Sequence, residues 1–172
     1  MRAVLIGTGM VANAHLAALK DAAGVSLEGV VGRNTQKTRA FSKKASALFG
    51  YTVRAFDTVE QVACSGAVDF AIIATPPDAR LDIIKTLTSR RIPILMEKPL
   101  ERNFAAAREI VDLCEASTMP CGVFFQNRTR EAAMAFKDTV DSGLIGDTIM
   151  AEIRVPWWRD QSYYDEPGRG TY

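Results

Sequence analysis

Glu97 and Lys98 place a carboxylate and an amine directly after an apolar run, Ile92 to Met96, that is typical of a buried strand. Pro99 follows at once, and a helical pattern begins a few residues later. A lysine held in a partly desolvated crevice can share in moving the proton of an alcohol, and its ammonium can polarise a carbonyl. The alternative is an exposed ion pair at a strand end. These two residues alone do not decide between the two interpretations.

A glycine-rich turn, GTGMVA, lies between the first predicted strand and the first predicted helix. It consists of Gly7, Thr8, Gly9, Met10, Val11 and Ala12. In such a turn the first glycine permits a tight bend, the second lets the backbone approach a pyrophosphate, and a small third residue permits close helix packing. The strand, turn and helix around it predict a dinucleotide-binding turn. The alternative is a glycine turn with a purely structural role.

The end of the second predicted strand carries cations and an amide. In NAD-preferring folds an acidic residue about 20 residues past the glycines binds the ribose 2′-hydroxyl. Here the chain has Gly32, Arg33 and Asn34, with Lys37 one helical turn further on. These side chains suit a 2′-phosphate, so we expect NADP to be preferred over NAD. The alternative is that Arg33 and Lys37 are solvated residues of a first helical turn.

The elements that must position these residues alternate along the chain. Strands covered on both faces, with helices between them, predict an α/β fold with a doubly wound parallel sheet. In the first helix we expect Val11, Ala14 and Ala18 to face the core. The predicted strands are Ala3 to Ile6, Val25 to Val31, Thr52 to Phe56, Val68 to Ala74, Ile92 to Met96 and Gly122 to Phe125. The main predicted helices are Met10 to Ala22, Asn34 to Gly50, Ala79 to Ser89 and Phe104 to Ala116.

The pattern changes after about Gln126. We expect a helix from Glu131 to Asp141 and then a strand, Thr148 to Val155, with one face more polar than the other. The sequence therefore predicts a dinucleotide-binding domain at residues 1–126 and, at residues 127–172, the incomplete start of a second α/β domain with a mainly antiparallel sheet. The unpaired edge at Thr148 to Val155 would favour a homo-oligomer through that sheet.

Composition excludes several classes of partner. The 21 basic and 20 acidic side chains nearly cancel, so charge indicates neither a nucleic-acid partner nor an anionic membrane. The N-terminal apolar run is too short for a signal peptide or a membrane span. Cys64, Cys114 and Cys121 have no C-x-x-C spacing, and we interpret them as reduced, buried thiols of a cytoplasmic protein. No metal site is expected.

Several segments together resemble the glucose-fructose oxidoreductase and inositol dehydrogenase family. They are GTGMVANAHLAAL, AIIATPPDA, MEKPL, FFQNR, a helix ending in SGLIGD, and VPWWRDQSYYDEPGRGTY. The match runs in order along the whole chain, and Glu-Lys-Pro is its most specific part. The resemblance implies a Rossmann domain that binds NAD or NADP, followed by a domain that holds a sugar, a cyclitol or a related polyol.

The resemblance also implies roles for individual residues. Lys98 would be the substrate-facing catalytic residue, and Lys98-Pro99 would be a cis bond. Departures from the family occur after the fourth main strand, where Pro77 and Arg80 stand in place of asparagine and histidine that members often carry. Residues that would contact the cofactor, beside those of the glycine turn and the ribose end, are Ala74, Thr75, Pro76, Pro77, Glu97, Lys98, Asn127, Trp158 and Arg159.

The segment that would complete the proton-transfer site in similar enzymes, a glycine-rich turn with a histidine, is not found in this sequence. We therefore expect the chain to correspond to the N-terminal half of an enzyme about twice as long. His15 is the only histidine, and we expect it to pack or cap rather than to catalyse. The aromatic residues Trp157, Trp158, Tyr163, Tyr164 and Tyr172 could stack on a sugar ring or belong to an interface or core.

The sequence thus predicts an NAD(P)-dependent oxidoreductase that transfers hydride between a nicotinamide and a carbohydrate-like hydroxyl or carbonyl. Lys98 would carry proton transfer, and Glu97 would help to position it. Two alternatives remain open at this point: a non-catalytic dinucleotide-binding protein, and a reductase of the same fold that acts on a non-sugar ligand such as an imine or a tetrapyrrole.

Overall fold

The computed structural model describes residues 1–166. Contacts within the chain divide it into two compact units, Met1–Gln126 and Asn127–Tyr172. Each unit is described by itself.

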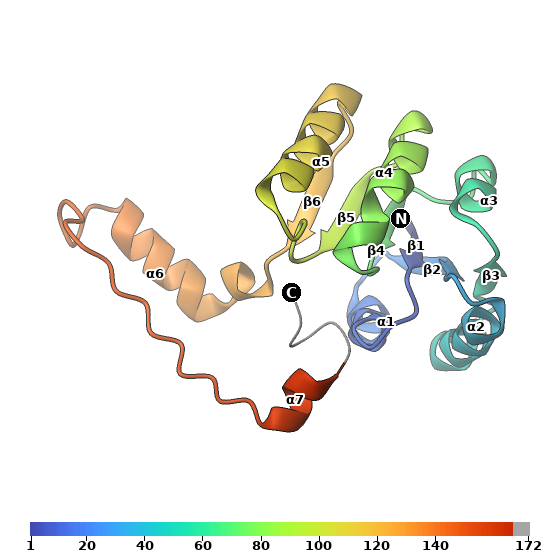
Figure 1. Ribbon diagram of the computed structural model, residues 1–172, viewed down its shortest axis with the longest axis horizontal. Helices are drawn as coiled ribbons and strands as arrows, with labels where there is room; N and C mark the ends of the chain where they lie inside the picture. The colour runs from blue at the N-terminus through green and yellow to red at the C-terminus, as the bar shows by residue number, and fades with distance from the viewer. Residues whose placement is uncertain (167–172) are drawn as a thin grey trace. The chain divides into compact units, whose positions relative to one another are not determined.

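The first unit is built on a sheet of six strands in the order β3-β2-β1-β4-β5-β6 (Figure 1). Every neighbouring pair of strands is parallel, which confirms the predicted doubly wound parallel sheet. The strands are β1 (Arg2–Ile6), β2 (Ser26–Val31), β3 (Arg54–Phe56), β4 (Phe70–Ile73), β5 (Ile94–Glu97) and β6 (Cys121–Phe124). The helices are α1 (Ala12–Asp21), α2 (Thr35–Phe49), α3 (Val59–Cys64), α4 (Arg80–Ser89) and α5 (Phe104–Ser117), with a 3-10 turn, η1 (Pro77–Ala79), before α4.

Helices cover both faces of the sheet. In Figure 1 helices α1 and α2 lie below the strands, and α3, α4 and α5 lie above them. Residues Ala3 to Ile6 of β1 are continuously apolar because both faces of the strand are buried. Ala3 and Leu5 belong to the core under α1 and α2, whereas Val4 and Ile6 belong to the core on the other face. Full burial of a side chain such as Leu5 stabilises the fold by about 1.5–3 kcal/mol.

The helices that follow β2 and β5, α2 and α5, begin at capping residues. The Asn34 side chain accepts a hydrogen bond from the Lys37 amide at 2.9 Å, and Asn103 accepts one from the Ala106 amide at 2.9 Å. Helix α2 ends at Gly50, whose φ of 77° is the left-handed conformation that glycine adopts readily. The two asparagine caps fix where the loops after β2 and β5, at the carboxyl edge of the sheet, end.

The buried face of α1 differs from the prediction. Ala12, His15, Leu16 and Leu19 face the core, whereas Val11, Ala14 and Ala18 are exposed. The spacing of Val11, Ala14 and Ala18 fits a helical face as well, but Leu16 and Leu19 offer more apolar surface to bury. The larger side chains therefore decide which face turns inward. The cysteine prediction also needs correction, because Cys64, at the end of the short helix α3, is exposed.

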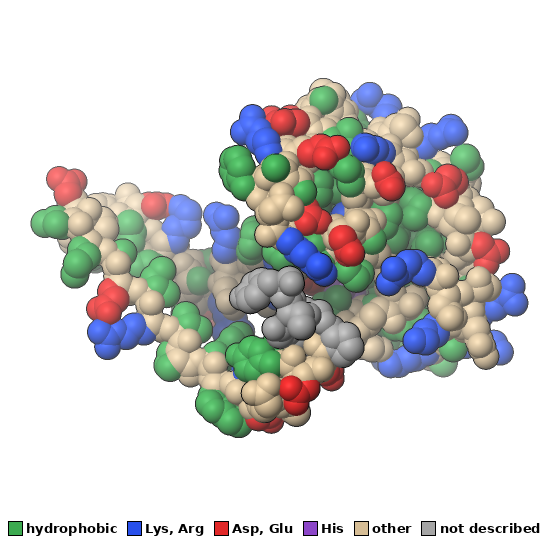
Figure 2. Space-filling model, viewed as in Figure 1, with side chains coloured by type: hydrophobic (Ala, Val, Ile, Leu, Met, Phe, Trp, Pro, Cys, Tyr) green, Lys and Arg blue, Asp and Glu red, His purple; other side chains and the backbone are tan. Residues whose placement is uncertain are grey.

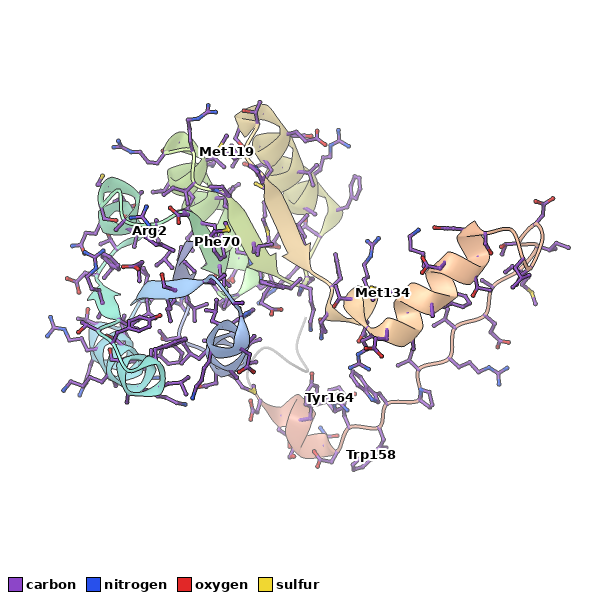
Figure 3. All side chains as sticks on the ribbon, turned by 180° about the vertical axis from the view of Figure 1, so that it is seen from behind. Arg2, Phe70, Met119, Met134, Trp158 and Tyr164 are labelled. Atoms are coloured by element: carbon purple, nitrogen blue, oxygen red, sulfur yellow. The ribbon has the colours of Figure 1, made fainter. Side chains whose placement is uncertain are left out.

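A 3-10 turn, η2 (Gln126–Thr129), begins at the last residue of the first unit, and the second unit contains the helices α6 (Glu131–Asp141) and α7 (Gln161–Asp165). Helix α6 has its predicted bounds. The predicted strand at Thr148 to Val155 is wrong for this structure, because no described residue of the unit pairs with it and a strand needs a hydrogen-bonded neighbour. Figure 3 labels Met134, Trp158 and Tyr164 of this unit, whose side chains are 47%, 79% and 46% exposed.

None of the helices within residues 1–166 is both long enough and apolar enough to cross a membrane.

Candidate functional site

The strand order reverses between β1 and β4, and the carboxyl ends of these two strands meet at one edge of the sheet. In open α/β sheets the ligand crevice lies outside the carboxyl ends at this point. Backbone hydrogen bonds hold the chain here: the Gly7 amide donates to the Val31 carbonyl at 2.8 Å, and the Ala74 amide donates to the Ile6 carbonyl at 2.7 Å. The ends of β2, β1 and β4 are therefore fixed relative to one another.

The glycine turn after β1 has the geometry that its residue types require. Gly7 has a φ of 112°, and a Cβ there would lie 2.6 Å from the Ala74 carbonyl oxygen. A Cβ on Gly9, by contrast, would meet nothing within 4 Å. Helix α1 then begins with Val11 as its N-cap, without a side-chain cap and without an acidic residue in the first turn. The bare helix end beside open backbone fits the pyrophosphate of a dinucleotide.

The turn after β2 lies against the glycine turn. A Cβ on Gly32 would come within 3.0 Å of Thr8 Oγ1 and 2.7 Å of Thr38 Oγ1, so the two turns approach closely. Arg33 and Lys37 are both exposed at this end of α2. The side-chain oxygen of Asn34 caps the helix, which is the role that its position at the helix start also predicts.

The surface around α2 is basic. No acidic residue occurs between positions 29 and 56, and blue side chains gather over the α2 region at the lower right of Figure 2. The exposed cations of the helix and its preceding turn are Arg33, Lys37, Arg39, Lys43 and Lys44. A group with two or more negative charges would be attracted to this surface.

The loop after β4 supplies a buried hydroxyl. Ala74 is buried, and Thr75 Oγ1 is buried without a hydrogen-bond partner among the described residues. A buried hydroxyl is ordinarily paired, so this atom is available to a polar group at the carboxyl edge. Pro76 and Pro77 continue the loop into η1. Ala74 and Thr75 therefore lie beside the glycine turn, and the expected contact of this loop with the cofactor stays a prediction.

Glu97, the last residue of β5, is held by a contact that the sequence did not predict. Its Oε1 lies 3.0 Å from Nε2 of His15, and its Oε2 accepts the Lys98 backbone N–H at 3.2 Å. The side chain of His15 is 10% exposed and that of Glu97 is 14% exposed. The His15 ring packs against the Phe124 ring, with 5.0 Å between the ring centroids. The expectation that His15 packs is confirmed. Glu97 pairs with His15 and not with the Lys98 side chain, so the exposed Glu-Lys ion pair is not what forms.

Lys98 itself is exposed, and the Lys98-Pro99 bond is cis, as the resemblance implies. The partial desolvation that would suit a proton-transferring lysine is not provided by the described residues of the first unit. Lys98 nevertheless stands at the carboxyl end of β5, on the same edge as the glycine turn, because all the strands run in parallel.

Arg80, at the start of α4, is a residue that sequence reasoning missed as part of the site. It is 1% exposed, and its guanidinium donates hydrogen bonds to backbone carbonyls of the loops after β4 and β5. Burial lowers the pKa of Arg80, and the carboxylates of Glu97 and Glu101 oppose this shift. The signal in the sequence was its spacing: Arg80 stands four residues before Ile84 and seven before Leu87, so it shares their apolar helical face.

Three predicted cofactor residues lie in the second unit. Asn127 belongs to η2, and Trp158 is exposed. The Arg159 guanidinium lies over the Trp157 ring at 4.7 Å, and its Nη1 donates to the Trp158 carbonyl at 3.0 Å. Their expected contact with a cofactor stays a prediction.

Comparison with known proteins gives concordant matches. A family model described as an oxidoreductase family with an NAD-binding Rossmann fold matches residues 1–125. The D-apiose dehydrogenase of Rhizobium rhizogenes is 25% identical over 86% of this chain and 41% of its own length, and the inositol 2-dehydrogenase of Rhizobium meliloti is 27% identical over 87% and 43%. The WlbA dehydrogenase of Chromobacterium violaceum, solved with NADH and UDP-GlcNAcA, superposes with a TM-score of 0.82 at 26% identity, over 99% of this chain and 48% of its own. The chain spans less than half the length of each of these proteins.

Proposed function

Because the chain belongs to the oxidoreductase family with the NAD-binding Rossmann fold, we propose that it forms the dinucleotide-binding part of a sugar or polyol dehydrogenase. The reaction is hydride transfer between a nicotinamide and a hydroxyl or carbonyl group of a sugar, a cyclitol or a related polyol. The observation that carries the proposal is the presence of the glycine turn and Lys98 at one edge of the sheet. The names of the relatives support the substrate class.

Each residue of the edge has a role in this proposal. The turn from Gly7 to Val11 holds the pyrophosphate at the start of α1, and Thr75 with the two prolines after it borders the nicotinamide. The nicotinamide, when bound, accepts or donates the hydride. Lys98 Nζ takes the proton of the substrate hydroxyl, or polarises the carbonyl in the opposite direction. Glu97 holds the backbone from which Lys98 extends, through the Lys98 amide.

NADP is the cofactor that the ribose end favours. Arg33 and Lys37 are exposed at the start of α2, no acidic residue occurs between positions 29 and 56, and a 2′-phosphate would receive charge-assisted hydrogen bonds from the two cations. A 2′-hydroxyl would find no carboxylate among residues 29–56. The cationic surface therefore supports NADP over NAD.

The second unit, residues 127–172, would contribute to the substrate side. In this proposal Asn127, Trp158 and Arg159 contact the cofactor, and exposed apolar side chains such as Ile149 and Ile153, 97% and 86% exposed, are covered in a homo-oligomer. Sedimentation of the chain at several concentrations distinguishes a monomer from such an assembly.

Calorimetric titration of the chain with NADP and with NAD tests the proposal. We expect NADP to bind at least about tenfold more tightly, since a hydrogen bond to a charged group contributes about 1.5–3 kcal/mol. Arg33→Ala should remove much of that difference in affinity. The control Lys20→Ala, which removes an exposed cation from the last turn of α1, should not. Lys98→Met should leave both affinities unchanged and, in a dehydrogenase that also contains the substrate-binding part, abolish hydride transfer from sugars and cyclitols to NADP.

Equal affinities would contradict the NADP preference. A folded chain that binds neither dinucleotide would contradict the function as a whole. Hydride transfer that survives Lys98→Met would remove Lys98 from the mechanism.

A further inference from the structure

Arg80 is a buried cation whose hydrogen bonds go to backbone oxygens. Nε and Nη2 donate to the Thr75 carbonyl at 3.2 and 2.8 Å. Nη1 donates to the carbonyls of Glu97 and Pro99, and it lies 3.5 Å from the Leu100 carbonyl. An arginine that is 1% exposed is ordinarily paired with a carboxylate, so the use of four carbonyls requires an explanation.

The acceptors come from two loops that the proposed function uses. Thr75 follows β4 and carries the buried hydroxyl beside the glycine turn. Glu97 and Pro99 are the residues immediately before and after Lys98, and their carbonyls converge on a single nitrogen. The backbone on both sides of Lys98 is therefore hydrogen-bonded to the Arg80 guanidinium. The same guanidinium fixes the position of this backbone relative to the loop after β4.

We propose, on the basis of the function proposed above, that Arg80 is a positioning residue that holds Lys98 at a fixed position relative to the nicotinamide side of the site. It acts through the backbone and touches neither substrate nor cofactor in this role. His15 holds the same strand end from the opposite face of the sheet, through the Glu97 side chain. The loop after β5 is thus held by a buried side chain on each face of the sheet.

The role needs a guanidinium and not merely a positive charge. Arginine offers five N–H donors in one rigid plane, and here they span carbonyls separated by the width of two strand ends. A lysine ammonium in the same place has three donors on one atom and cannot reach both loops at once. Arg80→Lys consequently keeps the charge and removes the bridge, and Arg80→Met removes both.

Amide hydrogen exchange of the 172-residue chain measures the bridge directly. In Arg80→Lys and Arg80→Met we expect the amides of Thr75, Lys98 and Leu100 to exchange about tenfold faster or more, because each loop loses hydrogen bonds to a charged donor. The amides of β1 serve as an internal reference and should not change. Arg90→Met, which removes an exposed arginine from the end of the same helix, is the control and should leave all of them unchanged.

The NMR signal of the Lys98 side chain, assigned by its loss in Lys98→Arg, supplies a readout that a purely structural arginine would not alter. In the natural chain, addition of NADP should shift this signal. In Arg80→Lys, we expect NADP to bind with a dissociation constant within about threefold of the natural value, but the shift of the Lys98 signal should be lost or much smaller.

The outcomes separate the two proposals. If the natural chain binds no dinucleotide, the proposed function fails, and the exchange data still show whether Arg80 joins the loops. If the natural chain binds NADP but both variants keep natural exchange rates and the natural Lys98 shift, the positioning role of Arg80 is overturned. Uniformly faster exchange across β1 and both loops also overturns it, because Arg80 would then stabilise the fold as a whole.

Discussion

The two glycines of the turn after β1 should respond to alanine in opposite ways. At Gly7 a Cβ would lie 2.6 Å from the Ala74 oxygen and 2.7 Å from the Ala74 carbon, and both atoms belong to backbone that cannot move aside. A φ of 112° adds strain of about 1–3 kcal/mol for a residue with a side chain, and the overlap adds about 1–3 kcal/mol. Gly7→Ala should therefore lower the free energy of unfolding by about 2–6 kcal/mol. This is a large part of the about 5–15 kcal/mol of an ordinary domain.

Gly9→Ala is the matched control within the same turn. Its Cβ would meet nothing within 4 Å, so the free energy of unfolding should change by less than about 0.5 kcal/mol. The same Cβ would stand where the backbone must approach a pyrophosphate. We expect NADP binding to weaken by about 1–3 kcal/mol, or about 5–150-fold in the dissociation constant.

Urea unfolding followed by circular dichroism measures the first quantity, and calorimetric titration measures the second. The reasoning would be refuted by a Gly7→Ala chain of natural stability, since the close approach to Ala74 would then be wrong. A Gly9→Ala chain that binds NADP normally would indicate the alternative left open by the sequence, a turn whose glycines serve only the fold.

Two further predictions concern buried polar groups. His15→Leu removes the partner of the Glu97 carboxylate, which is 14% exposed, so it should lower the free energy of unfolding in urea by about 1–3 kcal/mol. Adding Glu97→Gln should recover part of that loss. Strictly additive effects of the two substitutions would show that the side chains do not interact. Partial burial and a hydrogen bond with Cys121 raise the pKa of Cys114 to about 12, so near pH 8 iodoacetamide should label exposed Cys64 first and half-buried Cys114 much more slowly. Peptide mass spectrometry reads the order of labelling, and early modification of Cys114 would contradict the burial.

The fold of the first unit was predictable because its signals are local. Strand β4 reads as Phe-Ala-Ile-Ile and is buried at all four positions, which marks a strand covered on both faces. Asn34 and Asn103 cap the helices that they precede in the sequence. The buried face of α1 was not predictable with the same ease, since small residues such as Ala14 and Ala18 fit either side of a helix. The strand expected at Thr148 to Val155 depended on a partner that no described residue supplies.

The candidate site was predictable where it follows a strand end and not where it depends on tertiary contacts. The glycine turn, the loop at Thr75 and Lys98 each follow an apolar run, and parallel strands bring such positions to one edge. The contact between His15 and Glu97 joins residues 82 positions apart, and that between Arg80 and Glu97 joins residues 17 positions apart. His15 and Arg80 are each polar within an otherwise apolar helical face, which is a sign of burial without an indication of the partner.

The contacts of Glu97 explain why a carboxylate and an amine stand together after β5. One carboxylate oxygen contacts His15 and the other accepts the Lys98 amide, so both are engaged within the chain. The Lys98 side chain has no such engagement with Glu97 and is exposed at the edge where the glycine turn lies. The adjacent pair therefore divides into a residue that fixes the backbone and a residue whose amine is exposed. Exchanging the two residues would place the lysine at the position that contacts His15 and leave the carboxylate at the exposed position, so their order matters as much as their identity.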